Sequence, residues 1–291
     1  MPRALIVTHH APDLDAVTAV WLLKRFDSQN FASARIAFVN PGETLTAQEA
    51  EKLGSQIHQV THVDTGLGEF DHHQPERGQQ FISAASLVFD HICKIHPEHK
   101  ANRALQTIVE FTTNIDHFRE IYWPESDHAR YHFMIHELIK GIELQDPHDD
   151  DSQLNFGLTC LDSAYGTLTQ RFKAEEIIAS EGITFQTGAG NALGLLTSND
   201  DTIKIAQKQG FALVVRKDPK LGNIRIKARP DSNIDLKALA DLIKSKDQIG
   251  SWYYHPSGKM LINGSSKHRS QQASALSLEE VINLIKTTYP E

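Results

Sequence analysis

Short apolar runs alternate with stretches of helical spacing along roughly the first 70 residues. Residues 4–7, 34–39 and 59–66 are short and rich in aliphatic side chains, as buried parallel strands are. Residues 16–23 and 44–53, which lie between these runs, place their apolar side chains at helical spacing. The order strand, helix, strand, helix, strand predicts a right-handed parallel α/β sheet.

After residue 83 the apolar spacing becomes helical. Helices are predicted at residues 86–95, 102–111 and 128–142, and a longer one at residues 154–179. Between the last two, residues 146–151 carry four aspartates and one histidine. Because adjacent like charges without an apolar scaffold usually lie in water, we interpret this stretch as a solvated linker rather than a second metal site.

The remaining chain returns to alternating strands and helices. Strands are predicted at residues 211–215 and 223–229, and residues 185–196 are predicted to be a turn that leads into a strand. A hairpin is predicted at residues 251–263, and helices at 202–209, 235–244 and 276–287. We therefore expect an α/β protein. A parallel-sheet N-terminal domain with helices on both faces (residues 1–150) would be joined by a helical segment (151–183) to a smaller α/β C-terminal domain (184–291).

Candidate metal ligands follow the first apolar run. His9, Asp13 and Asp15 lie where the first strand ends and the next helix begins, and Asp15 is placed to be the N-cap of that helix. Ligands of open α/β sheets bind at this edge. Imidazole nitrogens and carboxylate oxygens suit divalent ions such as Mn²⁺, and Pro12 stiffens the turn that presents them. The loop predicts a metal site, with helix capping as the alternative role of its aspartates.

Further groups of the same chemistry lie at predicted strand ends or just beyond a helix. They are Asp64, the run Asp71-His72-His73, and Asp116, for which Glu110 and His117 are the alternatives. Because the ends of parallel strands meet at one edge, these side chains are candidates for one shared site.

Composition limits the possible partners. The formal net charge of −8 argues against a nucleic-acid groove over the whole surface, but it allows a local basic site. Cys93 and Cys160 form no C-x-x-C pair, so neither a disulfide framework nor a thiolate zinc site is expected. The N-terminus has no signal-peptide pattern, and no apolar run approaches the ~18 residues of a membrane span. We therefore expect a cytoplasmic protein with no membrane partner.

The best basic feature is one short predicted strand. Arg225, Lys227 and Arg229 recur at every second residue and therefore share one face of the strand. Three cations on one face could bind an anion, because arginine side chains match the geometry of phosphate. A solvated edge strand is the alternative interpretation.

The order of these groups resembles that of the DHH phosphoesterase superfamily, which includes RecJ-type exonucleases, nanoRNases, cyclic-dinucleotide phosphodiesterases and manganese-dependent inorganic pyrophosphatases. Residues 8–15 are similar to its first motif, 63–65 to its second and 71–73 to its third, and 114–117 match its fourth more loosely. The resemblance covers residues 1 to about 120 and implies that the N-terminal domain is a metal-binding catalytic domain.

This resemblance implies two bound divalent cations, Mn²⁺ in the first place, with Mg²⁺ or Co²⁺ as alternatives. His9, Asp13 and Asp64 would hold one ion, and Asp15, Asp64, His72 and Asp116 the other. Asp64 would bridge ions ~3.5–4 Å apart that activate a water and clamp the phosphate. Asp71 would orient an imidazole from outside the metal shell. His73 would face the substrate phosphate, or alternatively support the site without touching the substrate.

The C-terminal half resembles the DHH-associated domain over residues 224–239, where Arg229 stands at the position of a strand arginine. The family then carries a substrate-binding histidine after a run of glycines. His255 stands roughly there without the glycines, and a hairpin-turn role is its alternative. The implied substrate-binding residues are Arg225, Lys227, Arg229 and His255.

The expected function is that of a metal-dependent phosphoesterase, a hydrolase whose partner is a small phosphate-containing or short nucleic-acid substrate. Within this class we favour a phosphodiesterase acting on short oligonucleotides or a small nucleotide. An inorganic pyrophosphatase or polyphosphatase is one alternative. A catalytically silent nucleotide-binding regulator on the same fold is the other.

Overall fold

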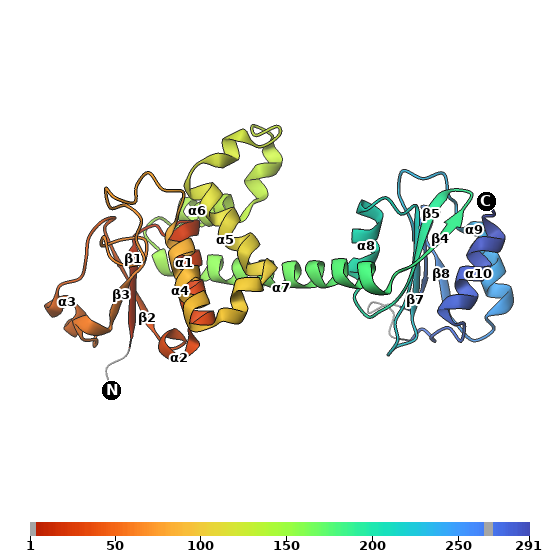
Figure 1. The fold of residues 1–291 in the computed structure, drawn as a ribbon, viewed down its shortest axis with the longest axis horizontal. Helices are drawn as coiled ribbons and strands as arrows, with labels where there is room; N and C mark the ends of the chain where they lie inside the picture. Colours follow the sequence, from red (N-terminus) through yellow and green to blue (C-terminus); the bar gives the residue numbers. More distant parts are fainter. Residues whose placement is uncertain (1–3, 265–269) are drawn as a thin grey trace. The chain divides into compact units, whose positions relative to one another are not determined.

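The computed structural model describes residues 4–264 and 270–291. It divides into two compact units, Met1–Leu168 and Thr169–Glu291, each with its own hydrophobic core (Figure 1). The helix α7 (Asp150–Glu181) begins in the first unit and ends in the second. Within the described residues, no helix combines the length and the apolar character that crossing a membrane requires.

A three-stranded parallel sheet in the order β2-β1-β3 organises the first unit. The central strand β1 (Leu5–His9) pairs with β2 (Arg35–Val39) and β3 (Val60–His62), as the apolar runs predicted. All three strands run in the same direction, so the segments that follow them meet at one edge of the sheet.

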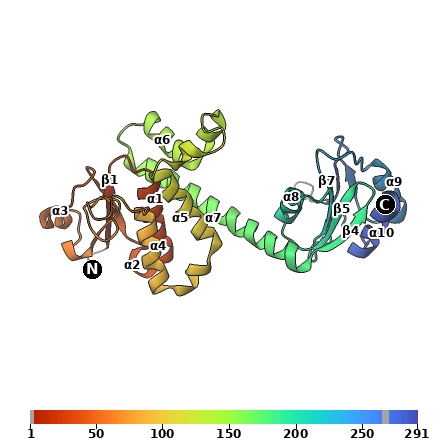
Figure 2. The same ribbon diagram turned by 45° about the horizontal axis from the view of Figure 1, so that its top comes forward.

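Helices cover both faces of this sheet. Those on one face are α1 (Leu14–Phe26), α4 (Ala84–Ile95) and α5 (Arg103–Asp116), which share the core around Ile6. On the other face, Leu5 and Val7 pack against Leu45 and Leu53, which flank α3 (Ala47–Lys52). Figures 1 and 2 both show α3 on the opposite side of β1 from α1. The predicted fold of this domain is confirmed.

The start of α1 differs from the prediction. Its N-cap is Asp13 rather than Asp15, and Asp13 Oδ1 accepts hydrogen bonds from the backbone N–H groups of Asp15 and Ala16 at 2.9 and 3.1 Å. Either aspartate precedes the apolar stripe of the helix, so the periodicity alone does not separate them. Because Asp13 caps the helix, the Asp15 side chain is free to make another contact.

The segment between α5 and α6 also departs from the prediction. The expected helix at residues 128–142 is split, because Met134 has an extended backbone between the 3₁₀ turn η4 (Ala129–Phe133) and α6 (Ile135–Gln145). A second turn, η3 (Arg119–Tyr122), follows α5. The ring centroid of Trp123 lies 5.7 Å from those of both Tyr131 and Phe111. Aromatic packing, rather than helical periodicity, therefore shapes residues 117–134.

The short elements of the first unit are α2 (Ser28–Phe31), η1 (Ile57–Gln59) and η2 (Pro97–Ala101). They connect the longer elements and contribute no candidate ligand. The site therefore depends on the three strands and on α1, α5 and their loops.

The second unit contains a six-stranded sheet in the order β4-β5-β6-β7-β9-β8. Its strands are β4 (Ile183–Thr187), β5 (Gly190–Leu196), β6 (Leu213–Lys217), β7 (Ile224–Ala228), β8 (Trp252–Tyr254) and β9 (Met260–Asn263). Among these described strands, β5 and β6 are parallel and the other neighbours are antiparallel. Residues 185–196 thus form a hairpin of two strands, which Gly190 makes possible with a φ of +111°.

Helices cover this second sheet as well. On one face, α9 (Lys237–Lys246) and α10 (Leu278–Thr288) pack over Ile224 and Ile226. On the other, α8 (Asp201–Lys208) and the end of α7 pack over Leu193 and Val214. The second unit is therefore α/β, as predicted.

Candidate metal centre

Most of the predicted metal ligands converge where β1 and β3 end. Three overlapping groups have their ligand atoms within 4.8 Å of one another: His9, Asp13 and Asp64; Asp64, His72 and His73; and His72, Asp116 and His117. Asp64 is common to the first two groups, and His72 is common to the last two. The fold thus brings residues from separate strands, helices and loops into one continuous cluster.

Asp64 lies at the centre of this cluster. Its backbone has a φ of +54°, which is unusual for a residue with a side chain, and its carboxylate is buried. Oδ2 lies 3.3 Å from His9 Nε2, and Oδ1 lies 3.5 Å from His72 Nε2. Among the described residues, Asp64 Oδ1 and His72 Nε2 are buried without a hydrogen-bond partner. Because buried polar atoms are normally paired, these two atoms fit the ligands of a metal ion.

His9 and Asp13 each keep one ligand atom available. The Nδ1–H of His9 donates to the carbonyl of His10 at 2.8 Å, so the neutral ring carries its lone pair on Nε2, which lies 3.3 Å from Asp64 Oδ2. Asp13 caps α1 with Oδ1, and within the described residues its Oδ2 makes no hydrogen bond. Helix capping and metal binding therefore use different atoms of Asp13 and are compatible.

Asp15 has a different environment. Its Oδ2 accepts from the backbone N–H of Ala84 at 2.6 Å, and its Oδ1 accepts from that of Ala85 at 2.8 Å. These bonds place a carboxylate at the N-terminus of α4, which the helix dipole favours. Oδ2 also lies 3.7 Å from His72 Nε2, at the border of the cluster. The structure adds this capping of α4, and the metal-ligand role of Asp15 stays a prediction.

Asp116 is better placed than its two alternatives. It is the last residue of α5, and its Oδ2 lies 3.6 Å from His72 Nε2. The Nε2–H of His117 donates to the carbonyl of Ile82 at 2.9 Å, so that atom is already engaged. Glu110 is exposed, nearly two turns earlier on α5.

His73 is oriented by Asp71. The Nδ1–H and the backbone N–H of His73 donate to Asp71 Oδ1 at 2.7 and 3.0 Å. Asp71 is fully buried, and its Oδ2 accepts from the backbone N–H of Leu67 at 2.6 Å. In the neutral imidazole this arrangement leaves Nε2 of His73 unprotonated, on a side chain that is 58% exposed. Such a pair presents a ring nitrogen to a neighbouring ligand.

A cleft with a volume of about 860 Å³ opens over this cluster. One wall carries Asp13, Asp15, His72, His73 and Asp116. A second set of lining residues, which we call the α6 wall, consists of Phe118, Glu120, His136, Glu137, Lys140 and Glu143. The volume lies in the range of sites that bind small molecules. The sequence analysis did not single out the α6 wall.

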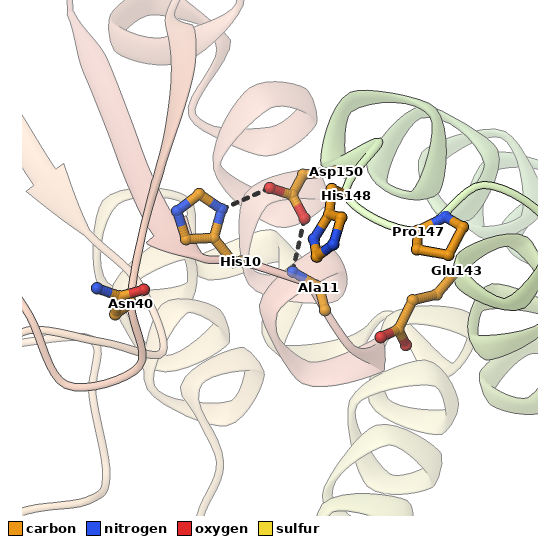
Figure 3. A pocket seen from close by; sticks show the side chains of 7 residues that line it. All are labelled: His10, Ala11, Asn40, Glu143, Pro147, His148 and Asp150. Carbon is orange, nitrogen blue, oxygen red and sulfur yellow. Dashed lines mark hydrogen bonds and ion pairs between the residues drawn. The ribbon is translucent and has the colours of Figure 1, made fainter.

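A second cavity, of about 340 Å³, shares Ala11 and Glu143 with the cleft. In Figure 3 the Asp150 carboxylate points toward His10 and Ala11. Asp150 Oδ2 lies 2.6 Å from His10 Nδ1, and Oδ1 accepts from the backbone N–H of Ala11 at 2.7 Å. The first turn of α7 therefore fastens the loop that carries His9 and Asp13.

The interpretation of residues 146–151 as a solvated linker is consequently wrong in its second half. Residues 146–148 are exposed, as expected, but α7 begins at Asp150. Asp149 accepts from the backbone N–H of Ser152 at 2.9 Å, and the Gln153 side chain donates to the carbonyl of Pro12 at 3.1 Å. The local run of charged residues predicted exposure to solvent. In the folded chain, however, residues about 140 positions earlier in the sequence form hydrogen bonds with Asp150 and Gln153.

Burial and neighbouring charges shift the pKa values of the cluster. Burial lowers the pKa of His9, but Asp64 and Asp13 outweigh it and raise that pKa to about 9. Burial raises the pKa of Asp116 to about 6, although the nearby His72 opposes this shift. Burial also disfavours the charge of Asp64, but His72 and His9 bring its pKa below the usual range. Without metal, the cluster therefore retains protons near neutral pH.

Metal binding is expected to release these protons. Because His9 must lose its proton to offer Nε2, the affinity for Mn²⁺ should rise between about pH 6 and pH 9, the interval between the pKa values of Asp116 and His9. Each displaced proton contributes up to about one unit of log K per pH unit. Calorimetric titration in buffers of different ionisation enthalpy measures both quantities. An affinity that does not change over this interval contradicts the assignment of His9, and His9→Ala should flatten the profile.

The second unit presents the predicted basic strand on one sheet face. Arg225 and Lys227 alternate with the buried Ile224, Ile226 and Ala228 of β7, so they point away from the core of α9 and α10. Arg225 pairs with Asp200, and Arg229, just beyond β7, pairs with Asp231. No described carboxylate pairs with Lys227, which makes its ammonium group the most available of the three cations.

His255 lies on the same face as Lys227. Its backbone N–H donates to the carbonyl of Met260 at 2.9 Å, which continues the pairing of β8 with β9. Met260 is in turn the partner of Lys227 across β7 and β9. Directly opposed residues of antiparallel strands share a face, so Lys227, Met260 and His255 stand in line. His255 Nδ1 also lies 2.8 Å from Ser257 Oγ in the hairpin turn.

No family model matches the chain, and no curated protein matches it significantly. The chain is similar to several solved structures, three of which are described below. A DHH domain described as a member of a family of ribosomal proteins shares 14% identity at a TM-score of 0.34, over 98% of this chain and 86% of that one. RecJ from Thermus thermophilus, in complex with Mn²⁺, shares 11% identity at a TM-score of 0.33, over 97% of this chain and 51% of RecJ.

The chain thus spans about half the length of RecJ. An exopolyphosphatase-related protein from Bacteroides fragilis shares 15% identity at a TM-score of 0.24, over 99% of this chain and 91% of that protein. At TM-scores this low, the similarities carry no weight for function. The function proposed for this chain rests on its own residues.

Proposed function

We propose that the chain is a two-metal-dependent phosphodiesterase that acts on short oligonucleotides or a small nucleotide. One observation carries the proposal: overlapping ligand groups are joined through Asp64 and His72, and both of these residues have a buried ligand atom without a described partner. Asp64 suits the bridging position, between His9 on one side and His72 on the other. The donor set of imidazoles and carboxylates suits Mn²⁺, with Mg²⁺ and Co²⁺ as alternatives.

Divalent ions held there would supply Lewis acidity to the phosphate and to its attacking water. The chain supplies the orientation and the proton transfer. Asp71 holds His73 with a proton on Nδ1, so Nε2 is left to exchange a proton with the substrate. The buried carboxylates and imidazoles act in a low-dielectric setting that strengthens their charge interactions.

Size and charge support a small substrate. The cleft has a volume of about 860 Å³, and the chain carries a net charge of −8. Long single strands are usually held along extended basic grooves with stacking aromatic side chains. The cations proposed for substrate binding, by contrast, are confined to one short strand and its neighbour.

A substrate panel tests the proposal. Chelator-treated protein is reloaded with Mn²⁺ and supplied with dinucleotides, cyclic dinucleotides, a long single strand, pyrophosphate or polyphosphate. We expect the fastest turnover with dinucleotides or cyclic dinucleotides. Faster turnover of pyrophosphate or polyphosphate would make the protein a phosphatase of those anhydrides. Mn²⁺ binding without turnover of any substrate would support the silent regulator.

Lys227→Ala tests the contribution of the second unit. Loss of its ammonium group is expected to raise the KM for a dinucleotide by roughly tenfold, the effect of one charged hydrogen bond, without changing the metal content. Arg229→Ala should act in the same direction, and less strongly, because Asp231 already pairs with that guanidinium. Lys244→Ala, on the exposed side of α9, is the matched control. Equal KM values for Lys227→Ala and Lys244→Ala would remove Lys227 from the site.

A further inference from the structure

The α6 wall of the cleft contains polar atoms that the proposed chemistry does not use. Glu120 Oε2 and His136 Nδ1 are buried and, among the described residues, have no hydrogen-bond partner. Both residues line the cleft that lies over the candidate metal centre. Buried polar atoms of folded proteins are nearly always paired, so these two unpaired atoms mark side chains that can turn toward a ligand in the cleft.

Aromatic packing fixes this wall. The ring of His136 lies 6.0 Å from that of Phe111, which in turn contacts the ring of Trp123. The hydroxyl of Tyr131 donates to the carbonyl of Pro124 at 2.7 Å and anchors the turn. This packing holds the backbone of the wall in place before a ligand binds, which lowers the entropic cost of binding.

Phe118 provides a second, independent observation. Its backbone has a φ of +53°, a conformation that is strained for a bulky residue. Its side chain is 73% exposed, and it lines the same cleft two residues after Asp116. Strain of this kind persists where the surroundings enforce it, often at ligand-binding sites. An exposed ring beside the candidate centre suits a flat ligand that stacks on it.

We propose that the α6 wall is a nucleobase subsite, in which Phe118 stacks on the face of the base while Glu120 and His136 bind its edge. The subsite rests on the proposed phosphodiesterase function and specifies what the substrate carries beside its phosphate. Among the described residues, no group of metal-ligand atoms includes Glu120 or His136, which favours an organic ligand over a further ion. Lys140 lines the same cleft and adds a cation to the α6 wall.

The hydrogen-bonding groups of the α6 wall also predict which nucleobase binds most tightly. A carboxylate only accepts hydrogen bonds, so the base edge at Glu120 must present N–H groups. Burial lowers the pKa of His136, and the neutral ring offers one donor and one acceptor. Guanine presents two adjacent N–H groups on its Watson–Crick edge, whereas uracil presents one. Guanine is therefore expected to bind most tightly and uracil least.

Binding of nucleoside monophosphates tests the subsite without relying on turnover. The Mn²⁺-loaded protein is titrated calorimetrically with guanosine 5′-monophosphate, uridine 5′-monophosphate or ribose 5-phosphate, which lacks a base. Guanosine 5′-monophosphate should bind roughly tenfold or more tightly than ribose 5-phosphate, as stacking of one base implies. Phe118→Ala should remove most of this difference, and Phe118→Trp should retain it. Glu120→Gln should reduce the preference for guanine over uracil.

Phe133→Ala is the matched control, because Phe133 is a similarly exposed ring on η4 that does not line the cleft. It should leave all three affinities unchanged. Equal affinity of the wild type for guanosine 5′-monophosphate and ribose 5-phosphate would overturn the subsite, as would equal losses in Phe118→Ala and Phe133→Ala. Hydrolysis of dinucleotides by the same wild-type protein would then show that the phosphodiesterase proposal stands while the subsite fails.

Discussion

Asp64→Asn is expected to abolish most of the stabilisation that Mn²⁺ gives the first unit. Asp64 contacts both His9 and His72, so its loss affects both proposed ion positions. At a metal concentration of about 100 Kd, binding stabilises a protein by about 2.7 kcal/mol. For a unit of this size, that corresponds to a Tm rise of about 5–10 °C. Thermal denaturation of chelator-treated protein, with and without Mn²⁺, measures this rise in the wild type and in the variant.

Asp27→Asn is the control for this experiment. Asp27 is also a buried aspartate beside a histidine, since its Oδ2 lies 3.3 Å from His91 Nε2, but it does not belong to the cluster. Its variant should keep the full Mn²⁺-dependent rise even if its metal-free Tm falls. Equal rises in the wild type and in Asp64→Asn would rule out the bridging role of Asp64. Asp64→Asn should also lower turnover by more than about a hundredfold, because outer-shell changes alone cost roughly 10–100-fold.

His73→Ala is expected to lower turnover by about 10²–10⁴-fold, the usual contribution of a general acid or base, while the bound metal is retained. The reason is that Asp71 binds Nδ1 of His73, which leaves Nε2 of this largely exposed side chain for proton transfer. His72→Ala should instead reduce the metal content, since His72 Nε2 is buried among Asp15, Asp64 and Asp116. Elemental analysis and single-turnover kinetics separate the two effects.

Asp71→Asn separates positioning from direct participation in catalysis. The amide can still accept a hydrogen bond, but it stabilises a charged His73 less well, so the pH profile of kcat should move while the metal content does not. A variant of His73 that loses metal, together with a variant of His72 that keeps it, would mean that the two histidines have exchanged roles. In that case His73 would be a metal ligand, and no residue would be assigned to proton transfer.

The sheet edge could be predicted from the sequence because it depends on local patterns. Three aliphatic runs predicted three parallel strands, and parallel strands necessarily bring their following segments together. The sequence therefore predicted that His9, Asp13, Asp64 and the run Asp71-His72-His73 lie at one edge of the sheet. Asp116 was placed just beyond the predicted helix at residues 102–111, which in the structure extends to include it.

Other features depend on contacts that no local pattern encodes. Asp13 and Asp15 both precede the α1 stripe, and only the approach of α4 decides that Asp15 binds the backbone of Ala84 and Ala85. The α6 wall was missed for a similar reason. Glu120 lies in a segment that aromatic packing shapes, and the approach of α6, which brings His136 to the cleft, is not encoded in its helical period.

The contact between α7 and the first loop bears on how the protein is made. Asp150 lies 139 residues after Ala11, which it anchors. Synthesis at about 5–20 residues per second therefore leaves the loop unanchored for roughly 7–30 s. For most of that interval the nascent chain already carries His9, Asp13 and Asp64, but it lacks the helix turn that fastens the loop after β1. The order of events on the ribosome thus favours late completion of the candidate metal site, after residue 153 has emerged and the loop has closed.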